Sequence, residues 1–206
     1  MSGLVLVAGI MAGVTLSGLL ACTIFNEELK IWPTPGKGSW QSRIFWTLFR
    51  TLNVATLALA FLDWQPWEGF SLERGLGATL SIASFALYGW ACYALGRRNL
   101  YCGRAGLITG GVYSWTRNPQ YAAAIPAYLG LAVASNSIAV FAIASLLTLS
   151  FVLMAFAEEH WLEAAYGADY RRYRREVARF YNWRHALAVL KEEVMPAKEN
   201  SEEARL

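Results

Sequence analysis

The sequence predicts an all-α integral membrane protein with about five transmembrane helices. Of its 206 residues, 56% are hydrophobic and 16% are charged, whereas soluble domains carry about 25% charged residues. The apolar residues also gather in long runs, and about 20 such residues are needed to cross roughly 30 Å of hydrocarbon. These two observations indicate a small membrane protein. The net charge of +3 gives no reason to expect a nucleic-acid partner.

Three apolar runs near the N-terminus have the length of a membrane span. Residues 4–25 carry no charge, and residues 76–95 form a clean third span. The second run, residues 44–62, contains one charge, Arg50, and one amide, Asn53. Arg50 lies less than two helical turns from the start of its run, so its side chain is expected to reach back to the interface. Asn53 lies one turn deeper, where it meets either a substrate or a neighbouring helix.

The last two spans are predicted to form a helical hairpin. Residues 121–134 are a marginal span that contains Pro126, and residues 138–157 are a full span. A proline is tolerated in a membrane helix where neighbouring helices satisfy the carbonyl that it leaves free. The sequence Ser135-Asn136-Ser137 is the expected turn between the two arms.

The fifth helix is expected to continue beyond the membrane to Tyr166 and to stop at Gly167, a residue type favoured just past helix ends. Asp169 can then cap a second, amphipathic helix. Four of its residues fall on one stripe: Tyr170, Tyr173, Val177 and Phe180. Residues 1–190 therefore form a single domain, and the charged tail, residues 191–206, is expected to be disordered.

The basic residues predict the orientation, because Lys and Arg near span ends accumulate on the cytoplasmic side. With the N-terminus outside and the C-terminus inside, most basic residues fall in inner segments: Lys30, Lys37, Arg43, Arg97, Arg98, Arg104, Arg117, Arg171, Arg172, Arg174, Arg175, Arg179 and Arg184. The outer loop, residues 63–73, holds three acids. Trp32, Trp40 and Trp46 fit an aromatic belt at the inner interface.

Polar residues cluster between the apolar runs on this cytoplasmic side. The stretches are Thr109-Gly110-Gly111-Val112-Tyr113, Arg117-Asn118-Pro119-Gln120-Tyr121 and, at the end of the fifth span, Glu158-Glu159. A charge at the membrane edge costs free energy unless it has a partner. Paired carboxylates and an arginine at one edge therefore indicate a functional site.

These stretches, in this order, resemble the signature of integral membrane methyltransferases. The matching pieces are Thr109-x-Gly111-x-Tyr113, Arg117-x-Pro119-x-Tyr121, Glu158-Glu159-x-x-Leu162, Tyr166-Gly167-x-x-Tyr170-x-x-Tyr173 and Val177-x-Arg179-Phe180. The family includes isoprenylcysteine carboxyl methyltransferases and phospholipid N-methyltransferases. The resemblance covers about residues 107–180. It departs at Val112, where the family commonly has proline, and at Asn118, where it commonly has a histidine that contacts the cofactor.

The resemblance implies an S-adenosylmethionine site that faces the cytoplasm. The residues implied to bind the cofactor are Thr109, Gly110, Gly111, Tyr113, Arg117, Asn118, Pro119, Tyr121, Glu158 and Glu159. Arg179, Glu159 and Asn53 are the candidate catalytic residues. Asn118 keeps a hydrogen-bond donor and acceptor but lacks a titratable ring, so no base is expected there. The implied acceptor is lipid-like or membrane-delivered: an isoprenylcysteine carboxylate, a phospholipid amine or a related small acceptor.

The chemistry is consistent with these residue types. Methyl transfer from a sulfonium is an in-line displacement that needs orientation and desolvation and no protein nucleophile. Glu158 or Glu159 can hold the cofactor's amino group, and Arg117 or Arg179 its carboxylate, through charge-assisted hydrogen bonds. Gly110 and Gly111 allow close approach of the backbone.

Two other functions remain open. Glu159-His160, Tyr166-Gly167-Ala168-Asp169 and Tyr173 are also similar to the C-terminal region of sterol reductases, which implies an NADPH-dependent membrane reductase. A non-enzymatic membrane scaffold is the third reading. No metal site is expected, since Cys22, Cys92 and Cys102 lack metal-ligand spacing. Oligomeric state is not encoded in any recognisable pattern.

Overall fold

The computed structural model describes residues 1–26, 28–66, 71–101, 103 and 105–181. The described chain consists of five α-helices and one short 3-10 helix, η1. Their bounds are α1 (Ser2–Phe25), α2 (Trp40–Leu62), α3 (Leu72–Leu100), η1 (Gly111–Ser114), α4 (Pro119–Ser135) and α5 (Ile138–Glu176). The predicted disordered tail, residues 191–206, lies outside the described residues, as do Cys102, Arg104 and Arg184.

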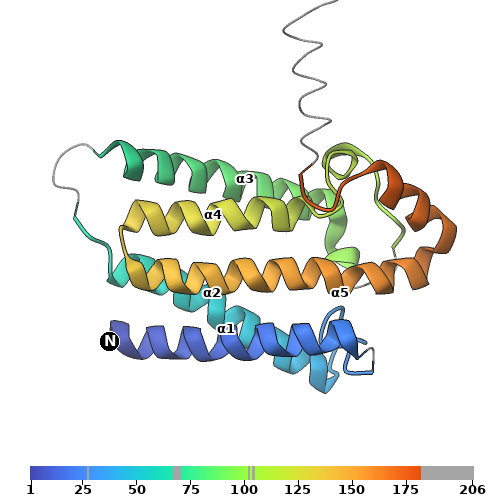
Figure 1. Cartoon of the computed structure of the whole chain (residues 1–206), viewed down its shortest axis with the longest axis horizontal. Coiled ribbons are helices and arrows are strands. Elements are labelled where there is room, and N and C mark those ends of the chain that lie inside the picture. Colours follow the sequence, from blue (N-terminus) through green and yellow to red (C-terminus); the bar gives the residue numbers. More distant parts are fainter. Residues whose placement is uncertain (27, 67–70, 102, 104, 182–206) are drawn as a thin grey trace, which may run out of the picture.

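The all-helical class is confirmed for the described residues, and four of the helices are candidate membrane spans. Helices α1, α2, α3 and α5 are long and apolar enough to cross a membrane, with mean hydropathy between 1.3 and 2.5 in their most apolar stretches. Helix α4 has 17 residues, or about 26 Å at 1.5 Å per residue, slightly less than the hydrocarbon thickness of about 30 Å. It lies between α3 and α5 in Figure 1. A fifth span formed by α4 therefore stays a prediction.

Serine side chains fix where three of the helices begin. Ser39, Ser71 and Ser137 precede α2, α3 and α5, and each side chain accepts a hydrogen bond from a backbone amide in the first turn. Such caps satisfy donors that have no partner inside the helix. Asn136, between α4 and α5, adopts a left-handed conformation with φ of 52°. The predicted turn at residues 135–137 is therefore present.

Helix α5 extends well beyond a bilayer. The 29 residues before the break at Gly167 (138–166) correspond to about 44 Å, more than the hydrocarbon thickness of about 30 Å, so we expect the charged segment from Glu158 onward to project from the membrane. The predicted break at Gly167 is present, with φ of 53° and ψ of −120°. Beyond it the chain turns back across the end of the bundle (Figure 1).

The expected amphipathic helix requires one correction. The helical segment after Gly167 ends at Glu176, and Val177 is extended, with ψ of 132°. Val177 and Phe180 therefore do not share a helical stripe with Tyr170 and Tyr173. Because the extended segment leaves the helix here, it can run along other elements, and this placement matters for the site.

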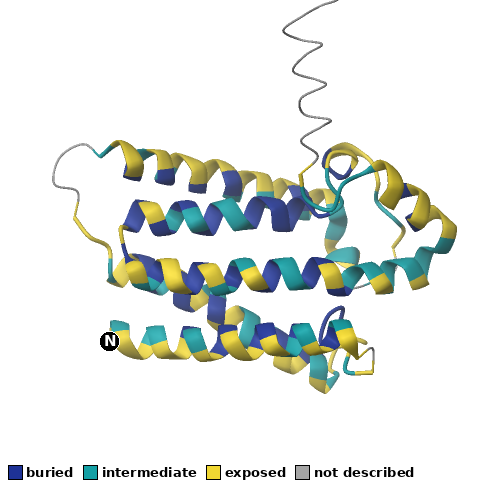
Figure 2. Ribbon diagram, in the orientation of Figure 1, coloured by how far each residue is buried: buried dark blue, intermediate teal, exposed yellow. Residues whose placement is uncertain are grey.

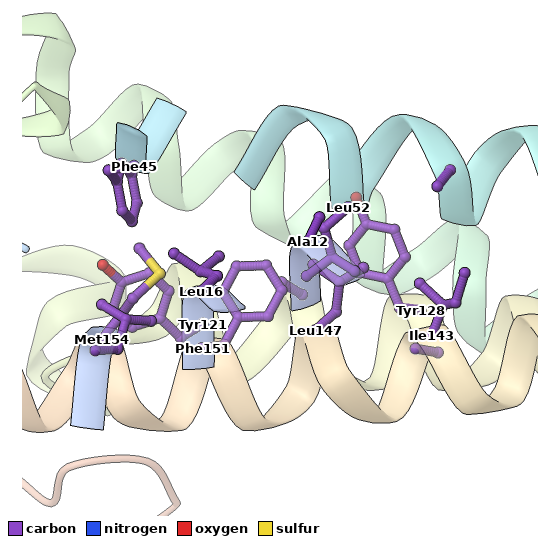
Figure 3. Packing of buried hydrophobic residues seen from close by; sticks show 14 of the residues in the cluster. Ala12, Leu16, Phe45, Leu52, Tyr121, Tyr128, Ile143, Leu147, Phe151 and Met154 are labelled. Carbon is purple, nitrogen blue, oxygen red and sulfur yellow. The ribbon is translucent and has the colours of Figure 1, made fainter. Parts of the chain in front are cut away.

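The core joins α1, α2, α4 and α5, whose buried side chains meet along the bundle axis (Figure 3). Helix α3 instead packs mainly on α4. A Cβ atom on Gly77 would lie 2.9 Å from the Gly130 carbonyl oxygen, so small residues let the two backbones touch. The outer face of α3 is exposed in Figure 2 and carries large apolar residues such as Leu76, Leu80 and Ile82.

The alternating helix directions give the bundle two distinct ends. We call the end where α1 and α3 finish and α2 and α4 begin the site end; in Figure 1 it lies on the right, where α5 continues past the bundle. The opposite end, where α4 finishes and α5 begins, is the far end. All the polar stretches singled out in the sequence gather at the site end.

Candidate active site

A cavity opens at the site end between the loop before α4, the loop that joins α1 and α2, the end of α3, and the part of α5 from Ala155 to Tyr173. The cavity itself has a volume of about 80 Å³ and lies within a wider hollow of about 750 Å³ that includes open solvent. Aromatic, acidic and basic side chains share its wall: Trp32, Tyr113, Arg117, Asn118, Glu158, Glu159, Trp161, Tyr166, Tyr170 and Tyr173. Within the described residues, no group of three or more His, Cys, Asp or Glu side chains is arranged to hold a metal ion.

Glu159 is held between two arginines. Arg117 Nη1 lies 2.8 Å from Glu159 Oε1, and Arg179 donates from Nε and Nη2 to the two carboxylate oxygens, each at 2.7 Å. This two-pronged pairing is the strong geometry for arginine and carboxylate. Burial alone would raise the pKa of Glu159, but the Arg179 hydrogen bond and the two arginine charges outweigh it, and the pKa lies below its usual range. Glu159 is therefore ionised.

Glu158 has the opposite environment. Trp32 Nε1 donates to its Oε1 at 2.6 Å, and the Tyr121 hydroxyl donates to the same oxygen. Both donors are neutral, and no ion pair to Glu158 is present in the described part of the chain. Desolvation by the surrounding protein raises the pKa of Glu158 to about 7, although the two hydrogen bonds act to lower it. The pKa values of these two neighbouring carboxyl groups are thus shifted in opposite directions, and Glu158 is the more readily protonated of the two.

The loop before α4 is fastened by two tyrosines. Gly111, the first residue of η1, has φ of 61°, a conformation that favours glycine. Tyr113 donates from its hydroxyl to Gln120 Oε1 at 2.6 Å, and Tyr173 donates to the Tyr113 carbonyl at 2.6 Å. The end of α5 is thereby attached to the loop. This attachment fixes the position of the loop relative to the two carboxylates.

The structure brings five of the twelve sequence-predicted site residues to the wall of the cavity. Tyr113, Arg117, Asn118, Glu158 and Glu159 line it. Tyr121 and Arg179 adjoin it through their bonds to Glu158 and Glu159. Four others lie apart: Thr109, Gly110 and Gly111 are exposed in the loop, and Pro119 is buried as the first residue of α4.

Asn53 is not brought to this cavity. Tyr128 on α4 donates its hydroxyl to Asn53 Oδ1, and Asn53 Nδ2 donates to the Phe49 carbonyl at 2.7 Å. Of the two partners expected for Asn53, the neighbouring helix is the one present. Phe151 lies between Tyr121 and Tyr128, 5.7 Å and 6.3 Å away between ring centroids, so Asn53 lies deeper in the bundle than the carboxylates.

One comparison with known proteins bears on this cavity. Residues 72–169 match the model of the phospholipid methyltransferase family. This match confirms the resemblance to integral membrane methyltransferases. The methyltransferase-matched segment begins at α3 and ends just past the kink at Gly167, so it contains η1, α4 and both carboxylates. No curated protein and no solved structure matches the chain.

Several groups at the cavity lie outside the methyltransferase-matched segment, and sequence reasoning assigned them other roles. Trp32 was expected in an interfacial belt, yet it binds Glu158, 126 positions away. Tyr170 accepts a hydrogen bond from Arg117 Nη1 at 3.1 Å, and Tyr173 holds the loop. The three-residue spacing of the two tyrosines signals a shared helix face. Nothing in the spacing of Trp32 signals its partner.

Proposed function

We propose that this protein transfers a methyl group from S-adenosylmethionine to a lipid-like or membrane-delivered acceptor. The observation that carries the proposal is the pair of unlike carboxylates beside a buried arginine, in a cavity built largely from the methyltransferase-matched segment. The candidate acceptors are a phospholipid amine, an isoprenylcysteine carboxylate or a related small acceptor. The membrane setting supports a lipid-like acceptor, because the cavity lies where apolar helices end.

The wall offers partners for the amino-acid part of the cofactor. Glu158 lacks a cationic partner among the described residues and can accept the ammonium group. Arg117 Nε is buried without a hydrogen-bond partner in the described part of the chain, and an unpartnered buried donor costs about 1–3 kcal/mol. A ligand carboxylate beside Arg117 would relieve that cost after a small side-chain shift. The residues present therefore fit the cofactor.

Glu159 is assigned a different part from Glu158. Both of its oxygens are already bonded to Arg117 or Arg179, so it has little capacity left for a ligand ammonium. It instead orients the Arg117 guanidinium and neutralises part of the positive charge there. The aromatic wall formed by Trp161, Tyr166 and Tyr170 suits stacking of a flat heterocyclic base.

Catalysis in this arrangement rests on orientation and exclusion of water. When bound, the cofactor supplies an electrophilic methyl group on a sulfonium, and the attacking acceptor atom forms its bond to carbon as the sulfur–carbon bond breaks. The side chains around the cavity fix both reactants and lower the local polarity. A carboxylate acceptor arrives ionised, whereas an ammonium acceptor must first lose a proton.

The proposal places the site end in the cytoplasm. Lys30, Lys37, Arg43, Arg97 and Arg98 all lie at or near helix ends there, as expected for loops retained inside. This orientation gives the cavity access to a water-soluble cofactor made in the cytosol.

The decisive experiment measures binding of S-adenosylmethionine and of NADPH separately, by calorimetry on the full chain in nanodiscs. We expect heat with S-adenosylmethionine only. Heat with NADPH alone would support the reductase, and no heat with either ligand, from folded protein, would support the scaffold.

A matched pair of variants tests the assignment of Glu158. Glu158→Gln removes the proposed ammonium partner and is expected to weaken cofactor binding about ten- to a hundredfold, the value of a hydrogen bond to a charged group. Glu163→Gln is the control, because Glu163 pairs with the exposed Arg174 at 2.9 Å, outside the cavity. Equal affinities in the two variants would remove Glu158 from the site.

A further inference from the structure

Pro126 leaves an acceptor unused inside α4. A proline has no amide hydrogen, so the carbonyl four residues earlier, that of Ala122, loses its helical partner. In this structure the Tyr181 hydroxyl donates to the Ala122 carbonyl oxygen at 2.6 Å. A residue 59 positions later in the chain thus supplies the hydrogen bond that the helix lacks.

Tyr181, the last residue that the structure describes, belongs to a short non-helical segment that runs along the start of α4. We call residues 178–181 the C-terminal strap. Its Ala178 carbonyl accepts from the Arg117 amide at 2.9 Å, and its Arg179 carbonyl accepts from Thr116 Oγ1 and Asn118 Nδ2, both at 3.0 Å. The strap is therefore bound at one end to the loop that carries Arg117 and at the other to α4.

The strap carries the side chain that holds Glu159. Arg179 is 30% exposed and comes from a segment with no secondary structure of its own, so its two bonds to Glu159 require the strap to be ordered first. Ordering a free segment of this kind opposes binding unless the fold has already fixed it. At its other end the strap is held by the Tyr181 hydrogen bond to α4, next to Phe180, which packs against the core.

We propose that Tyr181 is a positioning residue, which docks the strap on the carbonyl left free by Pro126 and so keeps Arg179 on Glu159 and Arg117 at the cavity. Docking of the strap and binding of the cofactor are then coupled, since both depend on the same arginine–carboxylate cluster. The link to cofactor binding rests on the proposed function, whereas the docking of the strap does not.

The test substitutes Tyr181→Phe in the full chain, in nanodiscs. The first readout needs no ligand: hydrogen exchange at the Arg117 amide, which donates to the strap, is expected to accelerate several-fold. The second is cofactor affinity, expected to fall about three- to tenfold, the effect of one neutral hydrogen bond. The KM for the acceptor should stay unchanged. Pro126→Ala, which restores an amide donor for Ala122, should shift both readouts the same way.

Tyr93→Phe is the matched control, because Tyr93 is 84% exposed on α3 and lies far from the strap in sequence; both readouts should stay at parental values. A double variant tests whether Tyr181 acts through Arg179 or only stabilises the fold. In an Arg179→Gln background, Tyr181→Phe should cause no further loss of cofactor affinity, since coupled residues are non-additive.

Each failure has its own reading. If hydrogen exchange at the Arg117 amide is as slow in Tyr181→Phe as in the parent, the proposal that Tyr181 docks the strap is wrong. Faster exchange with unchanged cofactor affinity overturns the coupling. If the parent protein binds no S-adenosylmethionine, the proposed function fails, and the exchange readout still decides whether Tyr181 docks the strap.

Discussion

Two buried arginines lie at opposite ends of this bundle, and their partners differ completely. Arg74, at the far end, is 8% exposed and donates to three main-chain carbonyls: those of Ala134 at 2.9 Å, Pro66 at 3.0 Å and Gln65. Its guanidinium also lies 5.5 Å from the centre of the Trp64 ring. Arg74 thus ties the loop before α3 to the last turn of α4.

Arg117, at the site end, has a buried side chain, 8% exposed, although the residue as a whole is half-buried. It forms an ion pair with the Glu159 carboxylate, and its Nη1 donates to the Tyr170 hydroxyl. Its Nε has no hydrogen-bond partner within the described residues. Both arginines border a hollow, but Arg74 donates to main-chain carbonyls, whereas Arg117 pairs with a carboxylate and keeps one unused donor within the described residues.

The contrast shows how a buried cation reveals its role. Burying a guanidinium is costly at either end, and the cost is offset only where its donors are satisfied. Main-chain acceptors belong to the fold, so Arg74 stabilises the fold. Titratable partners and an unused donor leave room for a ligand, and the proposed function therefore assigns Arg117 to the cofactor site. Burial alone would not have separated the two.

The largest expected effect is on stability, from Arg74→Leu. The substitution leaves three carbonyls without their donor, and even one unsatisfied buried group costs about 1–3 kcal/mol. We expect a loss of about 3 kcal/mol in the free energy of unfolding, measured by denaturation in detergent, with unchanged cofactor affinity in the protein that remains folded. Arg97→Leu, at an exposed position on α3, is the control and should change stability by less than about 0.5 kcal/mol.

The converse expectation holds for Arg117→Lys. Lysine keeps the charge but not the planar set of donors that serves Glu159, Tyr170 and a ligand at once. Cofactor affinity should fall about ten- to thirtyfold, or roughly 1.4–2 kcal/mol, while the unfolding temperature changes little. Isothermal titration and thermal unfolding of the same preparation decide the matter. If stability falls and affinity does not, Arg117 is a structural arginine like Arg74, and the proposed difference between the two arginines is wrong.

The sequence predicted the parts of this structure that depend on local patterns. Apolar runs predicted the helices, and Gly167 predicted the break in α5. The adjacent pair Glu158 and Glu159 lies at the wall of the cavity, and its role there stays a prediction. The Trp32 bond to Glu158 and the Tyr181 bond to Ala122 were not predictable, because each joins segments that only the tertiary fold brings together. The same limit applies to Arg74, which in the sequence is simply one basic residue at the edge of an acidic loop.

The prediction that the amphipathic helix continues through Phe180 was wrong for a related reason. Helical spacing continued past Glu176, but the chain there gains more from hydrogen bonds to the loop before α4 than from another helical turn. Asn118 shows the same competition. Its side chain does not cap α4, and its Nδ2 donates instead to the Arg179 carbonyl oxygen.

The smallest predicted effect sharpens the difference between the two carboxylates. Because the pKa of Glu158 is raised to about 7, this group is largely ionised at pH 8 and largely protonated at pH 6. An ammonium ligand requires the ionised form, so cofactor affinity should fall as the pH falls, by about tenfold between pH 8 and pH 6. Glu159, whose pKa lies below its usual range, stays ionised over this interval and contributes no slope. Titrations at the two pH values measure the effect, and Glu158→Gln should bind more weakly but equally at both. A parent protein with the same affinity at pH 6 and pH 8 would show that Glu158 does not hold the ligand's charge.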